Sequence, residues 1–267
     1  MGVKMSEYYT LISGASEGIG YEMVKIFAGR GYNLLLTARN ETKLRETQKQ
    51  LSTEHNIKIE IFAADLSLPQ TPRKIFEFCG EKDINVDILI NNAGFGQYGS
   101  FKETDFETEK SMINLNISAL TELCKLFIPP MIENHFGRIM NVASTAAFFP
   151  GPQMAVYYAS KAYVLSFSES LSTELAKHNI TVTALCPGPT RSKFMDRAHM
   201  SASRLFNNPL MHLMTSRQVA LYAYKALMKG KAIAVPGLNN KFLTLMPRFF
   251  PKAAIRFTMK QIMSARK

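Results

Sequence analysis

Short apolar runs alternate along the chain with longer segments whose apolar positions recur every three or four residues. The first pattern is typical of buried β-strands, and the second of helices that bury one face. The pattern predicts strands at Tyr8–Ser13, Tyr32–Thr37, Ile57–Phe62, Val86–Ile90, Gly137–Val142, Thr181–Cys186 and Ala232–Val235. It predicts helices at Ile19–Arg30, Glu41–His55, Pro69–Lys82, Thr108–Glu133 and Ala155–Lys177.

This order of elements predicts the fold class. Strands that alternate with long helices imply crossovers between parallel strands, with helices on both sides of the sheet. We therefore expect an α/β fold, a doubly wound Rossmann-type parallel sheet of about seven strands with helices on both faces. The 267 residues contain no evident linker. A single domain is thus expected over residues 1–267, with a core of about 8–235 and a basic amphipathic extension over 236–267.

A glycine-rich turn, Ser13-Gly14-Ala15-Ser16-Glu17-Gly18-Ile19-Gly20, joins the first predicted strand to the first predicted helix. Glycines allow a tight turn and let a pyrophosphate approach the backbone, and the helix N-terminus favours its negative charge. The position between strand and helix favours dinucleotide binding over an ordinary turn. The expected contacts are Gly14, Ser16, Gly18, Ile19 and Gly20.

The end of the second predicted strand indicates which dinucleotide is bound. An acidic side chain at this point accepts a hydrogen bond from the ribose of NAD, whereas arginine pairs with the 2′-phosphate of NADP. The sequence here is Thr37-Ala38-Arg39-Asn40, and the nearest acid, Glu41, is expected to begin the next helix. Arg39 therefore favours NADP(H) over NAD(H), unless it is only a solvated loop residue.

Charge is distributed unevenly along the chain. The net charge is +11, yet residues 1–196 carry 19 basic and 21 acidic side chains, and residues 197–267 carry 13 basic side chains and none that is acidic. Such a segment suits an anionic partner, either a phospholipid surface or an acyl thioester, although it could equally be a solvated basic face. We do not expect nucleic acid as a partner. Three widely spaced cysteines and five histidines without ligand-like spacing predict reduced thiols and no metal site.

Several short motifs, in one order along the chain, resemble the short-chain dehydrogenase/reductase family in its compact single-domain form. The resemblance covers about Tyr9 to Val235. It is carried by the glycine turn, Asp65-Leu66, Asn91-Asn92-Ala93-Gly94, Asn116, Ser144, Tyr157-x-x-x-Lys161 and Pro187-Gly188.

Tyr157 and Lys161 form the expected catalytic pair. They lie four residues apart in a predicted helix, so both side chains should project from one face. An ammonium about 5 Å from the phenol, at an effective dielectric of about 20, contributes about 3 kcal/mol, or about two pKa units. We therefore expect Lys161 to lower the pKa of Tyr157 toward the working pH, so that the phenol acts as general acid or base. The resemblance implies that Lys161 also binds the nicotinamide ribose.

Two further polar residues complete the expected catalytic group. Ser144 follows the strand that ends at Val142, so its hydroxyl could bind the substrate oxygen. Asn116 resembles the family asparagine that holds a proton-relay water.

The resemblance also implies the remaining cofactor contacts. Asp65 would accept from the adenine amino group, or could instead cap a helix that begins near Pro69. The other implied contacts are Leu66, Asn92, Ala93, Gly94, Pro187, Gly188 and Thr190.

The substrate is expected over the carboxyl edge of the sheet, between the loop after Phe95 and Ser192–Ser216, a segment that is rich in methionine and leucine. Beyond Val235, an apolar stretch precedes a predicted helix that begins at Pro251. This helix carries an apolar stripe of Ile255, Met259 and Ile262 beside a basic stripe of Lys252, Arg256 and Lys260. The helix could contact an anionic membrane or another subunit.

Together these features predict an NADP(H)-dependent oxidoreductase that interconverts a carbonyl and a secondary alcohol on a small hydrophobic molecule, either an acyl chain or a steroid-like ketone. The alternative is a non-catalytic NADP sensor or scaffold on the same fold. We expect a cytoplasmic homodimer or homotetramer, with peripheral membrane contact as a further option.

Overall fold

The sheet of this protein is fully parallel and has seven strands. A computed structural model describes residues 8–191 and 213–263. The strand order is β3-β2-β1-β4-β5-β6-β9. The bounds are β1 Tyr8–Ser13, β2 Asn33–Ala38, β3 Ile59–Ala63, β4 Asn85–Asn91, β5 Gly137–Val142, β6 Ile180–Leu185 and β9 Ile233–Ala234. The order reverses between β1 and β4, and ligands of doubly wound sheets bind at such a switch point.

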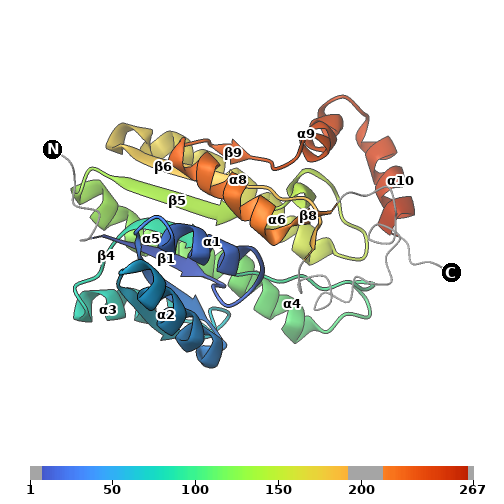
Figure 1. Ribbon diagram of the computed structural model, residues 1–267. Coiled ribbons are helices and arrows are strands. Elements are labelled where there is room, and N and C mark those ends of the chain that lie inside the picture. Colours follow the sequence, from blue (N-terminus) through green and yellow to red (C-terminus); the bar gives the residue numbers. More distant parts are fainter. Residues whose placement is uncertain (1–7, 192–212, 264–267) are drawn as a thin grey trace.

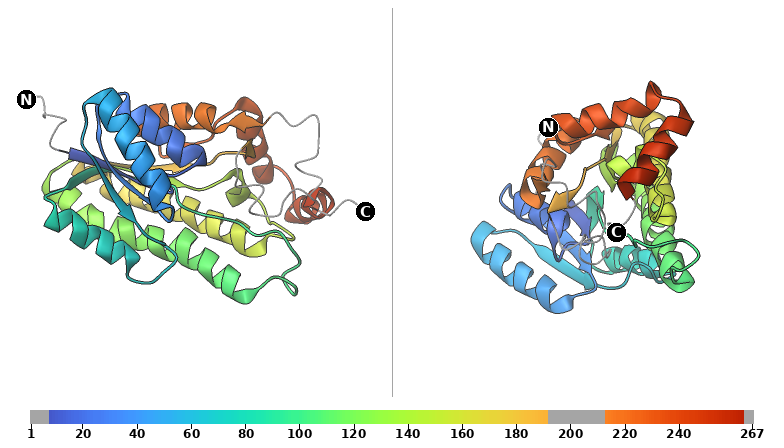
Figure 2. Two further views of the ribbon diagram at one scale, coloured as in Figure 1. Left: turned by 60° about the horizontal axis from the view of Figure 1, so that its bottom comes forward. Right: turned by 90° about the vertical axis from the view of Figure 1, so that its right-hand side faces the viewer.

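Helices cover both faces of the sheet, as the sequence predicted (Figure 1). One face is covered by α1 Gly18–Ala28, α2 Glu41–His55 and α8 Ser216–Met228, and the other by α3 Thr71–Glu81, α5 Leu120–Glu133 and α6 Ala155–Leu175. Figure 2 shows the two layers with the sheet between them. Each face has its own apolar core, one around Leu35, Leu89 and Phe127 and the other around Leu36, Ile90 and Phe27. The predicted fold class is therefore confirmed.

The long helix predicted from Thr108 is interrupted. The chain forms α4 Phe106–Ile113, then a π-helical turn over Asn114–Ala119, and then α5. In the described part of the chain, Phe106–Glu133 is the one helical stretch whose length and apolar content would suffice to cross a membrane. Its buried residues Leu120, Leu123 and Phe127 belong to a core cluster of the fold.

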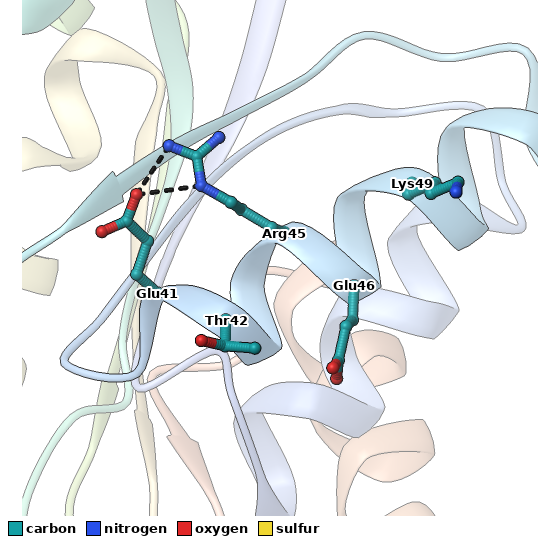
Figure 3. A pocket seen from close by; sticks show the side chains of 5 residues that line it. All are labelled: Glu41, Thr42, Arg45, Glu46 and Lys49. Carbon is teal, nitrogen blue, oxygen red and sulfur yellow. Dashed lines mark hydrogen bonds and ion pairs between the residues drawn. The ribbon is translucent and has the colours of Figure 1, made fainter.

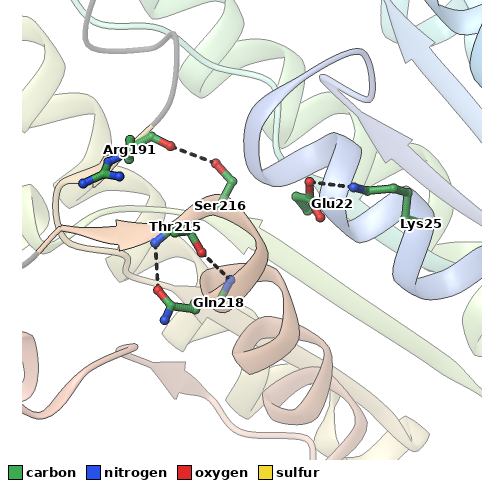
Figure 4. Close-up of polar contacts among 6 residues, drawn as sticks. All are labelled: Glu22, Lys25, Arg191, Thr215, Ser216 and Gln218. Carbon is green, nitrogen blue, oxygen red and sulfur yellow. Dashed lines mark hydrogen bonds and ion pairs between the residues drawn. The ribbon is translucent and has the colours of Figure 1, made fainter.

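The sequence analysis missed α8 and a small second sheet in which β7 Thr190–Arg191 pairs with β8 Met214–Thr215. The Thr215 side chain accepts from the Gln218 backbone, and the Gln218 side chain accepts from the Thr215 backbone, which forms a capping box (Figure 4). Ser216 Oγ donates to the carbonyl of Arg191 at 3.3 Å, which ties the start of α8 to β7.

The chain beyond β9 forms α9 Leu238–Leu245, a short 3₁₀ turn and α10 Lys252–Met263, at the end of the sheet to which the β5 arrow points (Figure 1). On α10, Met259 and Met263 are buried, and Ile255 packs against the cluster that contains them. Of the apolar stripe that was expected to meet a membrane or another subunit, Met259 and Ile255 therefore pack inside the protein against the cluster that contains Tyr158 and Met112, and Ile262 is half-buried.

Candidate active site

The glycine turn between β1 and α1 has the backbone that only glycine adopts easily. Gly14 and Gly18 have φ values of +64° and +60°. A Cβ on Gly14 would lie 2.7 Å from Nδ2 of Asn92, which donates to the carbonyl of Ser13 at 2.9 Å. Gly20 lies against the Gly14 carbonyl and leaves no room for a side chain. The turn therefore holds its backbone open toward a ligand while Gly20 sets the close packing of α1.

A cavity of about 780 Å³ runs from this turn to α6 along the carboxyl edge of the sheet. This volume lies in the range of small-molecule sites. Most of the residues predicted for the site line it: Gly14, Ser16, Gly18, Ile19, Arg39, Asp65, Leu66, Asn92, Ala93, Gly94, Ser144, Tyr157, Lys161, Pro187, Gly188 and Thr190. Gly20 and Asn116 do not line it. Phe95, at the expected border of the substrate region, and Glu17 of the glycine turn line it as well, and among the lining residues that were not predicted are Asn40, Leu115, Thr145 and Tyr158.

Arg39 lies at the end of the cavity formed by β2 and β3. Its guanidinium lies 3.8 Å from the carboxylate of Asp65, and both side chains are partly exposed. The nearest acid in sequence, Glu41, lies on α2, where Arg45 donates to its carboxylate at 2.6 and 2.9 Å (Figure 3). Glu41 is therefore engaged on the helix surface, and of the residues that the structure describes, Arg39 is the cation that lines this end of the cavity.

Asp65 does not cap α3, which has Gln70 at its N-cap position. That alternative is wrong. Instead, one carboxylate oxygen of Asp65 accepts from the backbone N–H and the hydroxyl of Ser67, at 2.9 and 2.7 Å. The carboxylate is thus fixed at the rim of the cavity by the turn that follows β3.

Tyr157 and Lys161 lie on one face of α6, as expected from their spacing, and both line the cavity. They are 8% and 5% exposed. The Lys161 Nζ lies 5.8 Å from the centroid of the Tyr157 ring and donates to the carbonyl of Val142 at 2.8 Å. Burial lowers the pKa of Lys161 to about 8.

The expected effect of Lys161 on the phenol does not occur in the protein alone. Burial raises the pKa of Tyr157 to about 12, and a hydrogen bond with Ser144 acts in the opposite direction. The physical reason is that the Lys161 ammonium is directed to a backbone carbonyl, while the phenol is enclosed by the apolar cluster around Met112 and Met154.

Ser144 follows β5 and contacts Tyr157. Its hydroxyl accepts from the backbone N–H of Ala146 at 3.1 Å and lies 3.5 Å from the carbonyl of Pro187. Pro187 itself accepts from the N–H of Thr145 at 2.9 Å. These bonds join the loops after β5 and β6, so Ser144 and Pro187 face the same end of the cavity.

Asn116 lies in the π-helical turn and is 1% exposed. Its amide pairs with the backbone of Phe95, accepting from the N–H at 3.2 Å and donating to the carbonyl at 3.0 Å. It also donates to the Ser160 hydroxyl at 3.1 Å. A Cβ on Gly94 would lie 2.9 Å from Asn116 Oδ1 and 3.4 Å from Lys161 Nζ. Asn116 therefore holds the loop after β4 in place beside Lys161.

The loop after β6 contacts the C-terminal segment. The Thr190 hydroxyl donates to the carbonyl of Gly188 at 2.9 Å. A Cβ on Gly188 would lie 2.6 Å from Nδ2 of Asn240 on α9, whose Nδ2 donates to the carbonyl of Pro236 at 2.7 Å. The turn at Gly188 is thus in close contact with α9.

The three cysteines, Cys79, Cys124 and Cys186, are buried and free. Within residues 8–191 and 213–263, no group of three or more histidine, cysteine or acidic side chains is arranged to hold a metal.

The site fits a phosphorylated dinucleotide. The glycine turn and the start of α1 present backbone to a pyrophosphate, with Arg39 beside them. At the other end of the cavity, Gly94 and Gly188 also line it, and each packs so closely against Asn116 or Asn240 that a side chain would collide there.

Comparison with known proteins agrees with this geometry. The chain is 35% identical over 185 residues to a very-long-chain 3-oxoacyl-CoA reductase of Vanderwaltozyma polyspora, covering 65% of this chain and 53% of that protein. It is 34% identical over 191 residues to the human inactive hydroxysteroid dehydrogenase-like protein 1, covering 69% of this chain and 56% of that protein. The chain thus spans about half the length of these two relatives.

A short-chain dehydrogenase from Sphingobium yanoikuyae, solved in complex with NADPH, superposes with a TM-score of 0.81 at 30% identity, covering 97% of this chain and 98% of that one. The family model for short chain dehydrogenases matches residues 9–202. The chain therefore belongs to the short-chain dehydrogenase family of oxidoreductases.

Proposed function

We propose that this protein is an NADP(H)-dependent oxidoreductase that interconverts a carbonyl and a secondary alcohol, with Tyr157 as the general acid or base. The observation that carries the proposal is that Tyr157 and Lys161 line the same cavity as the glycine turn and Arg39. Bound NADP(H) would supply or accept the hydride.

The cofactor contacts follow from the positions of the lining residues. The glycine turn with Ser16 and Ile19 would bind the pyrophosphate, and Arg39 the 2′-phosphate. Asp65 and Leu66, with Asn92, Ala93 and Gly94, would flank the adenosine. Lys161 would bind the nicotinamide ribose, and Pro187, Gly188 and Thr190 would contact the nicotinamide end. The NADPH bound to the Sphingobium relative supports this cofactor.

Tyr157 would hold or release the proton at its Oη. A buried phenol whose pKa is about 12 is protonated at neutral pH, which suits proton donation to the substrate oxygen during reduction. The hydrogen bond with Ser144 orients the phenol and favours its anion. Asn116, which binds Phe95 and Ser160 behind Lys161, would act as a positioning residue with access to a relay water.

The substrate is proposed to be hydrophobic, either an acyl chain or a ring system. Phe95, Leu115 and Tyr158 line the same cavity as Tyr157, and the reductase from Vanderwaltozyma polyspora is named for a long acyl substrate. Of the segment Ser192–Ser216, residues 192–212 lie outside the described residues. A homodimer or homotetramer in the cytoplasm stays a prediction.

The decisive experiment measures NADPH oxidation by the purified protein against a panel of apolar ketones and polar sugars. We expect turnover of apolar ketones, and Tyr157→Phe should reduce kcat by at least about a hundredfold, because proton transfer contributes about 10²–10⁴-fold. Equal rates for both proteins would show that another group transfers the proton.

A non-catalytic role is the second candidate, because a human relative is named inactive. It predicts that NADPH binds and that no ketone in the panel is reduced. The presence of Asn116, Ser144, Tyr157 and Lys161 favours the enzyme, since a sensor requires no proton donor in the cavity.

A further inference from the structure

We propose that the outer surface of α9, the following turn and α10 binds an anionic lipid bilayer peripherally. This lipid-facing surface consists of exposed apolar and basic residues: Leu238, Phe242, Leu245, Phe249, Phe250 and Phe257, with Lys241, Arg248, Lys252, Arg256 and Lys260.

The apolar part of this surface is unusually exposed. Leu238 is 81% exposed, Phe249 80%, Phe242 70% and Phe257 66%. Single exposed apolar residues are ordinary, but several large ones in one short segment are typical of an interaction site. All of these residues lie within a stretch of twenty residues, on α9, on α10 and in the turn between them.

The charged part is entirely basic. Lys241, Arg248, Lys252, Arg256 and Lys260 are all exposed, and the chain has no acidic residue after Asp196. Among the described residues, none of the ion pairs includes these five cations. The cations of this surface thus have no acidic neighbour in their own segment. The surface is therefore expected to attract an anionic partner.

The placement of α10 presents both kinds of side chain outward. Met259 and Met263 anchor one side of the helix in the protein, and Tyr98 Oη donates to the Met263 carbonyl at 2.7 Å. Arg256, Phe257 and Lys260 are exposed on the rest of the helix surface. Long basic side chains can then reach phosphate headgroups while phenylalanine enters the boundary of the acyl chains.

Other occupants fit this surface less well. In a two-fold dimer the same surface meets itself, so the basic residues of both copies would face like charge. Interfaces with nucleic acid are mostly polar, and they do not explain exposed leucine and phenylalanine. A bilayer with anionic headgroups satisfies both the charge and the apolar side chains.

The test is sedimentation of the full chain with vesicles of phosphatidylcholine, with and without phosphatidylserine. We expect binding to the vesicles that contain phosphatidylserine, and weaker binding as salt is added. Lys252→Glu combined with Arg256→Glu should weaken binding by at least about tenfold, because each basic residue near an anionic surface contributes about 1 kcal/mol. The control pair Lys49→Glu and Lys74→Glu, on α2 and α3, changes the net charge equally and should bind as the wild type does.

The apolar contribution is tested by the double variant Phe249→Ser and Phe257→Ser. Its control is the double variant Leu68→Ser and Phe136→Ser, because Leu68 and Phe136 are exposed apolar residues outside this surface. Only the first pair should reduce vesicle binding. The proposal is overturned if no vesicle binds, if the control pairs lose binding equally, or if the first pair instead abolishes self-association. Tyr157→Phe should bind vesicles normally, so this result does not depend on the proposed catalysis.

Discussion

Lys161 carries the largest electrostatic cost that can be assigned to a single residue of the candidate site. Its side chain is buried, and the contact that it makes is to a backbone carbonyl rather than a carboxylate. An ammonium without a carboxylate partner is costly to bury, and groups buried at such a cost are typical of ligand-binding sites.

This cost should appear in the pH dependence of stability. In the unfolded chain Lys161 titrates near 10.5, and in the folded chain near 8, so the unfolded state binds the extra proton between these values. The stability of the wild type should therefore rise from pH 8 to pH 10.5 by about 3 kcal/mol through this group alone, at about 1.4 kcal/mol per pKa unit. Lys161→Met lacks this contribution. Urea unfolding should therefore show that the free energy of unfolding of Lys161→Met, relative to that of the wild type, falls by this amount as the pH rises over that range.

The matched control for this measurement is Lys74→Met, which removes an exposed lysine from α3. Its difference from the wild type over the same pH range gives the baseline for an exposed lysine. If the Lys161→Met difference followed that baseline, the ammonium would not be desolvated as the structure indicates.

Most residues of the site could be predicted from the sequence, whereas the contacts between them could not. The motif order identified Tyr157 and Lys161 because their four-residue spacing fixes a common helix face. It could not reveal that Lys161 turns to the Val142 carbonyl or that the phenol is enclosed by apolar side chains, because both depend on contacts between distant segments. The role of Gly188 against Asn240 was hidden for the same reason.

Among the elements, the strands were predicted well and the helix ends less well. The bounds of β1, β5 and α2 were correct because a turn or cap residue marks each end. The missed helix α8 did have a signal, since Thr215 followed three residues later by Gln218 is a capping box. The π-helical turn at Asn116 had no such signal. The hydrogen bonds that the Asn116 amide makes there are to Phe95 in the loop after β4, which is distant in sequence.

The helix α10 is held to the protein mainly by its two methionines. Met263 is fully buried, and the Tyr158 hydroxyl lies 3.6 Å from its sulfur. Met263→Ala should release α10, since truncation of a buried methionine costs about 2–5 kcal/mol. We expect faster amide hydrogen exchange in α10 with little change in the strands, and a higher KM for apolar ketones. Phe257→Ala, on the outer side of the same helix, should leave both unchanged, and global destabilisation by Met263→Ala would contradict this account.

At the scale of the molecule, the cavity lies along the edge of the sheet and is bordered by both halves of the fold. A ligand that fills it should therefore stabilise the whole fold. NADPH at about a hundredfold excess over its Kd should add about 2.7 kcal/mol to the free energy of unfolding. Thermal denaturation should show a smaller shift with NADH at the same concentration, because Arg39 has no 2′-phosphate to bind.

The same measurement on Arg39→Ser tests whether this side chain distinguishes NADPH from NADH. A charge-assisted hydrogen bond contributes about 1.5–3 kcal/mol, so the affinity for NADPH should fall by about ten- to a hundredfold. The response to NADH should hardly change. A variant that lost both responses equally would show that Arg39 supports the fold of the turn rather than the 2′-phosphate.

The contact between Gly188 and Asn240 has a consequence for regulation. It places the nicotinamide end of the proposed cofactor site directly against α9, with no intervening layer. An agent that displaced α9 from Gly188 would therefore also disturb the nicotinamide end of the site. Thermodynamic reciprocity then requires the bound dinucleotide to weaken the affinity for that agent by the same factor.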